Sequence, residues 1–159
     1  MTAPLLVIAV GNPARGDDGL GPALVERLEA EGLAGVETLV DFQLQVEHAL
    51  DLVGRDAVLF VDASRVAVGA ALRRVAPAEA LPALSHALTP SGVLHVAQRL
   101  GQWLPEAWQL AIEGESFALG EGLSATASAR LPGALRAARQ WVDLQRASVK
   151  RRDMVCAQG

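Results

Sequence analysis

Near the start of the chain, a turn rich in glycine and proline (residues 11–22) separates an apolar run from an apolar-periodic segment. The run Leu5–Val10 is apolar at every position, which is typical of a strand buried on both faces. After the turn, apolar residues recur at helical spacing. We therefore predict a first strand over residues 5–10, a tight exposed turn, and a first helix over about residues 20–31.

The same alternation continues and indicates the fold class. We expect a second strand over residues 36–40, closed by Asp41, a helix over about 46–53, and a third apolar strand over 57–61. The helix is expected to bury Val46, Ala49, Leu50 and Val53. Strand, helix, strand, helix, strand is the pattern of a parallel sheet covered by helices, so the chain is assigned to the α/β class.

The second half predicts the rest of a single domain over residues 1–147. We expect a strand over 71–75, a helix capped by Thr89 that buries Val93, Leu94, Ala97, Leu100 and Leu104, a strand around 108–112, and a last helix ending near Gln145. Residues 148–159 are rich in basic residues and are expected to form a flexible tail.

Composition excludes several classes of function. The chain is 51% hydrophobic and 20% charged, as in a globular protein, and its net charge of −4 argues against nucleic acid as the main partner. It shows neither a signal peptide nor an apolar run of about 18 residues, so we expect no membrane partner. With Cys156 as the single cysteine, no internal disulfide is possible, and a cytoplasmic location is expected.

The first turn carries two adjacent carboxylates. Gly11 and Gly16 have the spacing of a phosphate-binding loop, but Asp17 and Asp18 occupy the places of its lysine and hydroxyl. Two carboxylates would repel a phosphate and would suit a cation or a proton donor. The alternative is that one of them caps the helix and the other is solvated.

A third carboxylate is expected beside this turn. Asp18 follows the first strand and Asp62 ends the third. If the strand order is 2-1-3, these strands are neighbours about 4.8 Å apart, and both side chains face one crevice at the carboxyl edge of the sheet. Repulsion between them is tolerable if a cation or a shared proton lies between them. A capping or turn role is the alternative for Asp62.

Three histidines compete for a place at this crevice. We expect His48 and His95 on polar helical faces, whereas His86 lies in a loop that leads into a helix, where binding residues concentrate. An ordinary loop histidine is the alternative for His86. Two aspartates and one imidazole form a mixed oxygen and nitrogen set that suits a divalent ion such as zinc, nickel or cobalt.

Four segments, taken in order, resemble the hydrogenase maturation proteases, which process the large subunit of NiFe-hydrogenases. They are Gly11-Asn12 with Gly16-Asp17-Asp18-Gly19-x-Gly21-Pro22; Val61-Asp62-Ala63; Ser85-His86-Ala87-Leu88; and Gly114-Glu115-Ser116-Phe117 with Gly120-Glu121-Gly122-Leu123-Ser124. The resemblance covers about residues 5–142. It implies a three-layer α/β/α sandwich around a twisted, mostly parallel five-stranded sheet with helices on both faces.

The resemblance also implies a function and a site. Asp18, Asp62 and His86 would contact nickel already seated in the precursor, after which a short C-terminal extension is removed. The nickel is then supplied by the substrate, and no tightly bound cofactor is expected. Asp41 occupies the place of a recurring acidic residue and is a candidate base, with a turn role as the alternative. Some members carry the histidine after the Thr/Ser-Pro pair, where this chain has Ser91.

The chemistry left by elimination fits this family. There is no His-Glu-x-x-His motif, and Gly114–Ala118 only approaches the Gly-x-Ser-x-Gly of serine hydrolases. A metal-polarised carbonyl or metal-bound water, with a carboxylate as base, remains. Two alternatives stay open: a nickel-checking chaperone without protease activity, and a nucleotide-binding flavodoxin-like domain, which the acidic turn disfavours.

Overall fold

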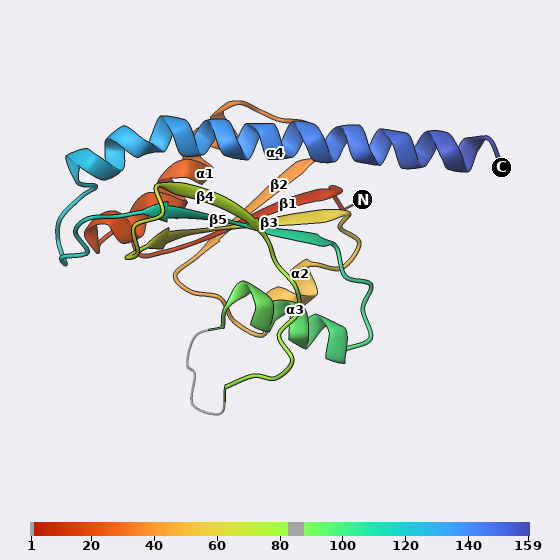
Figure 1. The fold of residues 1–159 in the computed structure, drawn as a ribbon, viewed down its shortest axis with the longest axis horizontal. Helices are drawn as coiled ribbons and strands as arrows, with labels where there is room; N and C mark the ends of the chain where they lie inside the picture. The colour runs from red at the N-terminus through yellow and green to blue at the C-terminus, as the bar shows by residue number, and fades with distance from the viewer. Residues whose placement is uncertain (1, 83–87) are drawn as a thin grey trace.

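The computed structural model describes residues 2–82 and 88–159. It contains a five-stranded sheet and four α-helices within this part of the chain (Figure 1). In chain order the elements are β1 (Leu5–Val10), a 3-10 turn (Gly16–Gly19), α1 (Leu20–Ala30), β2 (Val36–Asp41), α2 (His48–Asp51), β3 (Ala57–Ser64), β4 (Ala70–Arg74), α3 (Pro90–Arg99), β5 (Glu106–Glu113) and α4 (Ala125–Ala157).

The strand order is β2-β1-β3-β5-β4, and only β4 runs antiparallel to its neighbour. The predicted order 2-1-3 is therefore confirmed, as is the mostly parallel sheet. Val10 pairs with Asp41 across β1 and β2, and Asp62 pairs with Ala111 across β3 and β5. The carboxyl ends of β1, β2 and β3 thus lie together at one edge of the sheet.

Helices cover both faces of the sheet, which confirms the three-layer sandwich. Figure 1 shows α1 and α4 on one side and α2 and α3 on the other. Alternate residues of β1 contribute to the two hydrophobic cores, one on each face of the sheet. Leu5 and Val7 pack with the α1 and α4 layer, whereas Leu6 and Ile8 pack with the α2 and α3 layer. Because β1 is covered on both faces, all six of its residues are buried, as its continuous apolar sequence predicts.

The α2 region corrects one prediction. Helix α2 is a single turn, and its buried residues are His48 and Ala49, followed by Leu52. Val46, Leu50 and Val53, which were expected to face inward, are each more than half exposed. A helical period cannot be read over a segment that makes one turn, because its orientation is set by local bonds, here the amide of Gln45 donating to Nδ1 of His48.

The ends of α3 and α4 also differ from expectation. Thr89 caps α3 as predicted, but Leu100 lies just beyond its last residue and is 58% exposed. Helix α4 continues past Gln145 to Ala157, and Figure 1 shows it running beyond the sheet. Residues 146–157 contain no glycine or proline and many good helix formers, so nothing local ends the helix.

The helices of the described part of the chain lack the combination of length and apolarity needed to cross a membrane. The longest, α4, carries many charged residues in its last turns.

Gly21 sets how closely α1 approaches the sheet. A Cβ added there would lie 2.8 Å from the carbonyl oxygen of Val10 and 3.2 Å from that of Val61. We expect Gly21→Ala to lower the free energy of unfolding by about 1–3 kcal/mol, because α1 must move away from both strand ends. The measurement is urea unfolding followed by circular dichroism.

Gly133→Ala is the matched control. Gly133 lies in α4, where an added Cβ would meet only the end of the Arg136 side chain at 3.6 Å. Alanine there should be neutral or should stabilise by up to about 1 kcal/mol, the difference in helix propensity. Equal effects of the two substitutions would contradict the close approach of α1.

Candidate functional site

The first turn folds tightly back on itself at the end of β1. Gly11 has a φ of +146°, and a Cβ added to it would lie 1.9 Å from the carbonyl oxygen of Asp18. The amide of Asn12 donates to Oδ2 of Asp18 at 2.7 Å. Only glycine fits this approach, so the turn holds Asp18 directly beside the carboxyl end of β1.

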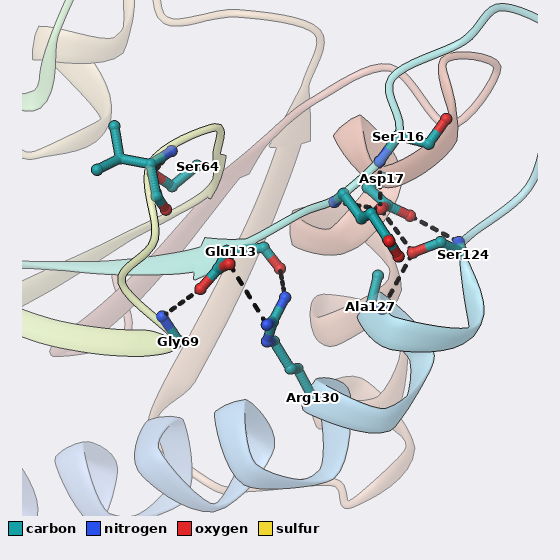
Figure 2. Close-up of polar contacts among 10 residues, drawn as sticks. Asp17, Ser64, Gly69, Glu113, Ser116, Ser124, Ala127 and Arg130 are labelled. Carbon is teal, nitrogen blue, oxygen red and sulfur yellow. Dashed lines mark hydrogen bonds and ion pairs between the residues drawn. The ribbon is translucent and has the colours of Figure 1, made fainter.

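The two adjacent aspartates have different roles. The side chain of Asp17 is fully buried and accepts hydrogen bonds from the amides of Glu115 (2.7 Å), Ser116 (3.0 Å) and Ser124 (2.7 Å), and from the Ser124 hydroxyl (2.7 Å) (Figure 2). Burial by itself would raise the pKa of Asp17, but these hydrogen bonds together hold it below its ordinary value. Asp17 is therefore a structural carboxylate.

Ser124 links this carboxylate to the last helix. Its hydroxyl donates to Asp17 and accepts from the amide of Ala127, so it caps the N-terminus of α4 (Figure 2). The alternative interpretation of the sequence, in which one of the two aspartates caps the helix that follows, is wrong. Asp17 instead contacts a loop about one hundred residues away, and α1 begins at Leu20 after Gly19, an N-cap residue without a side-chain hydrogen bond. The likeness of the segment 114–124 to a late family motif was the only sign of this contact in the sequence.

Asp18 and Asp62 lie in one cleft at the carboxyl edge of the sheet. The cleft measures about 180 Å³, and apolar residues form most of its described wall. These include Ile8, Val10, Phe42, Leu44, Phe60 and Leu88. As predicted from the strand order, Asp18 and Asp62 thus line the same cleft.

The two carboxylates repel each other. Burial raises the pKa of Asp62 to about 6, a hydrogen bond from the amide of Ala63 opposes this rise, and the charge of Asp18 adds to it. A positive charge placed between them would relieve both the burial cost and the repulsion. The pair therefore fits a cation with a preference for oxygen ligands.

Asp41 lies at the same edge but faces a different hollow. Its Oδ1 accepts from the amide of Phe42 at 2.7 Å, and its Oδ2 lies 3.3 Å from Nε2 of His48. Together with Gly11, Pro13 and Phe42, Asp41 lines a hollow beside the Asp18 and Asp62 cleft. The structure places Asp41 next to that cleft and outside its described wall.

The three histidines are placed as follows. His48 is buried, with 4% of its surface exposed, so its expected position on a polar face is wrong. His95 is half-buried rather than exposed, with Nδ1 2.7 Å from the carbonyl oxygen of Ala78. His86 lies outside the described residues. On the far side of that gap, Leu88 and Pro90 line the cleft.

Within residues 2–82 and 88–159, no three histidine, cysteine, aspartate or glutamate side chains gather closely enough to hold a metal ion. Asp18 and Asp62 thus form a pair in the described part of the chain. The predicted third ligand, His86, stays a prediction.

Several solved structures are similar to this chain over most of its length. The hydrogenase maturating endopeptidase HybD from E. coli is 26% identical with a TM-score of 0.66, over 91% of this chain and 93% of that chain. An endopeptidase from Escherichia coli is 25% identical with a TM-score of 0.63, over 84% and 88%. The NiFe-hydrogenase maturation protease HycI from Thermococcus kodakarensis KOD1 shares the fold at 23% identity and a TM-score of 0.62, over 91% and 93%.

The chain is similar to the hydrogenase maturation proteases. This confirms the resemblance drawn from the four sequence segments and, with it, the predicted enzyme class, a peptidase. No protein-family model and no curated protein sequence matches the chain.

The division of labour between Asp17 and Asp18 is testable. We expect Asp17→Asn to lower the free energy of unfolding by about 2–4 kcal/mol, because an amide group would face backbone donors that now bond to a carboxylate. Asp18→Asn should change it by less than about 1 kcal/mol, since the asparagine oxygen can still accept from the amide of Asn12. Urea titrations of both variants provide the measurement, and a reversed order would refute the assignment.

The pKa of Asp62 predicts a pH-dependent stability. Because this pKa of about 6 in the folded protein exceeds the ordinary 3.8, the folded protein binds more protons than the unfolded chain between these values. Its free energy of unfolding therefore falls as the pH rises through that range. The free energy of unfolding of Asp62→Asn, relative to that of wild type, should rise by about 1–3 kcal/mol as the pH increases from about 4 to about 7.5, in buffer with a chelator.

Glu26→Gln serves as the control, since Glu26 is exposed on α1. Its stability relative to wild type should stay nearly constant over the same range. If the stability of Asp62→Asn relative to wild type also stayed constant over this pH range, the ionised form of Asp62 would not be destabilised by its surroundings.

Proposed function

We propose that the protein is an endopeptidase that removes the C-terminal extension from the large-subunit precursor of a NiFe-hydrogenase after nickel insertion. The observation that carries the proposal is the pair Asp18 and Asp62, two carboxylates that repel each other in one cleft at the ends of β1 and β3. The similarity to HybD, a hydrogenase maturating endopeptidase, supports the same class of substrate.

In this proposal nickel belongs to the substrate. Asp18 and Asp62 each offer a carboxylate oxygen to the ion, and His86 would offer an imidazole nitrogen. A cleft with so few ligands holds a free ion weakly, because closed protein metal sites use four protein ligands. The protein itself would then keep no tightly bound metal, and the loaded precursor would complete the coordination.

The apolar wall of the cleft supports such a contact. The buried side chains of Ile8, Leu44 and Phe60 exclude water on one side of the carboxylate pair, and this lowers the local dielectric constant. The attraction between the pair and a divalent ion is correspondingly stronger than at an open surface. A precursor without nickel offers no such attraction and meets two half-buried carboxylates that repel each other instead.

Asp41 is the proposed base. The backbone of Asp41 is held beside Gly11, whose amide donates to the Asp41 carbonyl oxygen at 3.0 Å, and both residues line one hollow at the edge where the peptide would lie. A carboxylate there would take a proton from the attacking water as that water adds to the peptide carbonyl. His48 would keep its side chain oriented.

The test compares the processing of nickel-loaded and nickel-free precursor by mass spectrometry. We expect wild-type protein to shorten only the loaded precursor. Asp18→Asn and Asp62→Asn should slow this processing at least about 100-fold, because each removes a charged ligand at the reacting centre. Glu26→Gln, an exposed carboxylate on α1, should process normally.

Processing by either aspartate variant at the wild-type rate would refute the role of the pair. Binding of the loaded precursor by wild-type protein without any cleavage would favour the nickel-checking chaperone instead.

A further inference from the structure

A second, larger cleft shares the carboxylate pair and leads away from it. It measures about 610 Å³, and its lining includes Asp18 and Asp62. Arg65, which follows β3, and Arg73 in the edge strand β4 line the same cleft. One cleft thus holds both acidic and basic side chains.

Both arginines are held in place by uncharged partners. The guanidinium of Arg65 lies over the ring of Phe117, 4.0 Å from its centroid. Arg73 donates from Nε and Nη2 to Oε1 of Gln109 at 3.1 and 2.8 Å, across the β4 and β5 pairing. Contacts of these kinds orient a guanidinium and leave its charge uncompensated.

Among the ion pairs of the described residues, none involves Arg65 or Arg73. By contrast, Arg74, the next residue in β4, pairs with Glu106 at 3.1 Å. Arg65 and Arg73 thus line one cleft as oriented guanidinium groups, and neither takes part in those ion pairs. Their remaining N–H groups match the geometry of a carboxylate.

We propose that this cleft binds the peptide substrate on one side of the carboxylate pair and that Arg65 and Arg73 receive an acidic side chain of that peptide. The inference rests on the proposed function and adds a specificity site to it. The metal-bearing part of the substrate would lie at Asp18 and Asp62, with the acidic side chain a short distance along the same segment.

The cleft favours a peptide over other anions. Val66, Val68 and Ala71 form apolar parts of its wall, which suit the stem and neighbours of an acidic side chain. Asp18 and Asp62 in the same cleft would repel a polyanion such as nucleic acid. A ligand that suits the whole cleft therefore carries both positive and negative charge, as a metal-loaded acidic peptide does.

The experiment uses the full chain with both arginines replaced, Arg65→Gln/Arg73→Gln. The control variant Arg99→Gln/Arg136→Gln removes the same charge from exposed positions on α3 and α4. Two capped pentapeptides that differ only in a central glutamate or glutamine serve as probes. Binding is followed by the amide chemical shifts of the labelled protein.

We expect the glutamate peptide to bind wild type and control about fivefold more tightly than the glutamine peptide, and to lose this preference with Arg65→Gln/Arg73→Gln. In precursor processing the same variant should raise KM about fivefold and leave kcat within about twofold of wild type.

Equal binding of the two peptides by wild-type protein would overturn the inference, and so would an unchanged KM. If wild-type protein does not cut the precursor at all, the proposed function fails, and the peptide measurement still decides whether the arginines select an acidic group.

Discussion

The buried carboxylate of Asp17 ties the first turn to the other end of the chain. It accepts hydrogen bonds from three backbone amides and one hydroxyl of the segment that leads from β5 into α4. The same Ser124 hydroxyl accepts a hydrogen bond from the amide of Ala127 in the first turn of α4. With Asp17 turned into the protein, its neighbour Asp18 is left at the carboxyl end of β1. A pair of adjacent acidic residues thereby serves two purposes, one structural and one at the cleft.

The cleft shows a conflict between stability and charge placement. Asp18 and Asp62 would be farther apart in a protein selected for stability alone, because the burial of Asp62 and, to a lesser extent, the charge of Asp18 raise the pKa of Asp62 to about 6. Such strain concentrates where a ligand relieves it. The repulsion is confined to this edge of the sheet, while the buried strands β1 and β3 below it keep the backbone fixed.

Continuous apolar strands made the sheet predictable, because only burial on both faces favours such runs as Leu5–Val10. With the strand order, they also placed Asp18 and Asp62 in one cleft. The single turn of α2 was predicted on the wrong face, since the buried His48 bonds to the amide of Gln45 and to Asp41 and so sets its orientation. The contacts of Asp17 join residues about one hundred positions apart, and no periodicity records such a contact. Arg65 and Arg73 likewise line one cleft only because β5 pairs with both β3 and β4.

Two residues lie at the boundary between the cleft of Asp18 and Asp62 and the hollow of Asp41. They are Gly11 and Phe42, which line both cavities. Gly11 is fixed by its contact with the carbonyl of Asp18, whereas the side chain of Phe42 is 70% exposed. Few contacts hold an exposed aromatic ring, and a bound peptide can displace it at small cost. If Asp41 acts as the base, displacement of the Phe42 ring by a bound peptide would therefore open the hollow of Asp41 towards the cleft of Asp18 and Asp62.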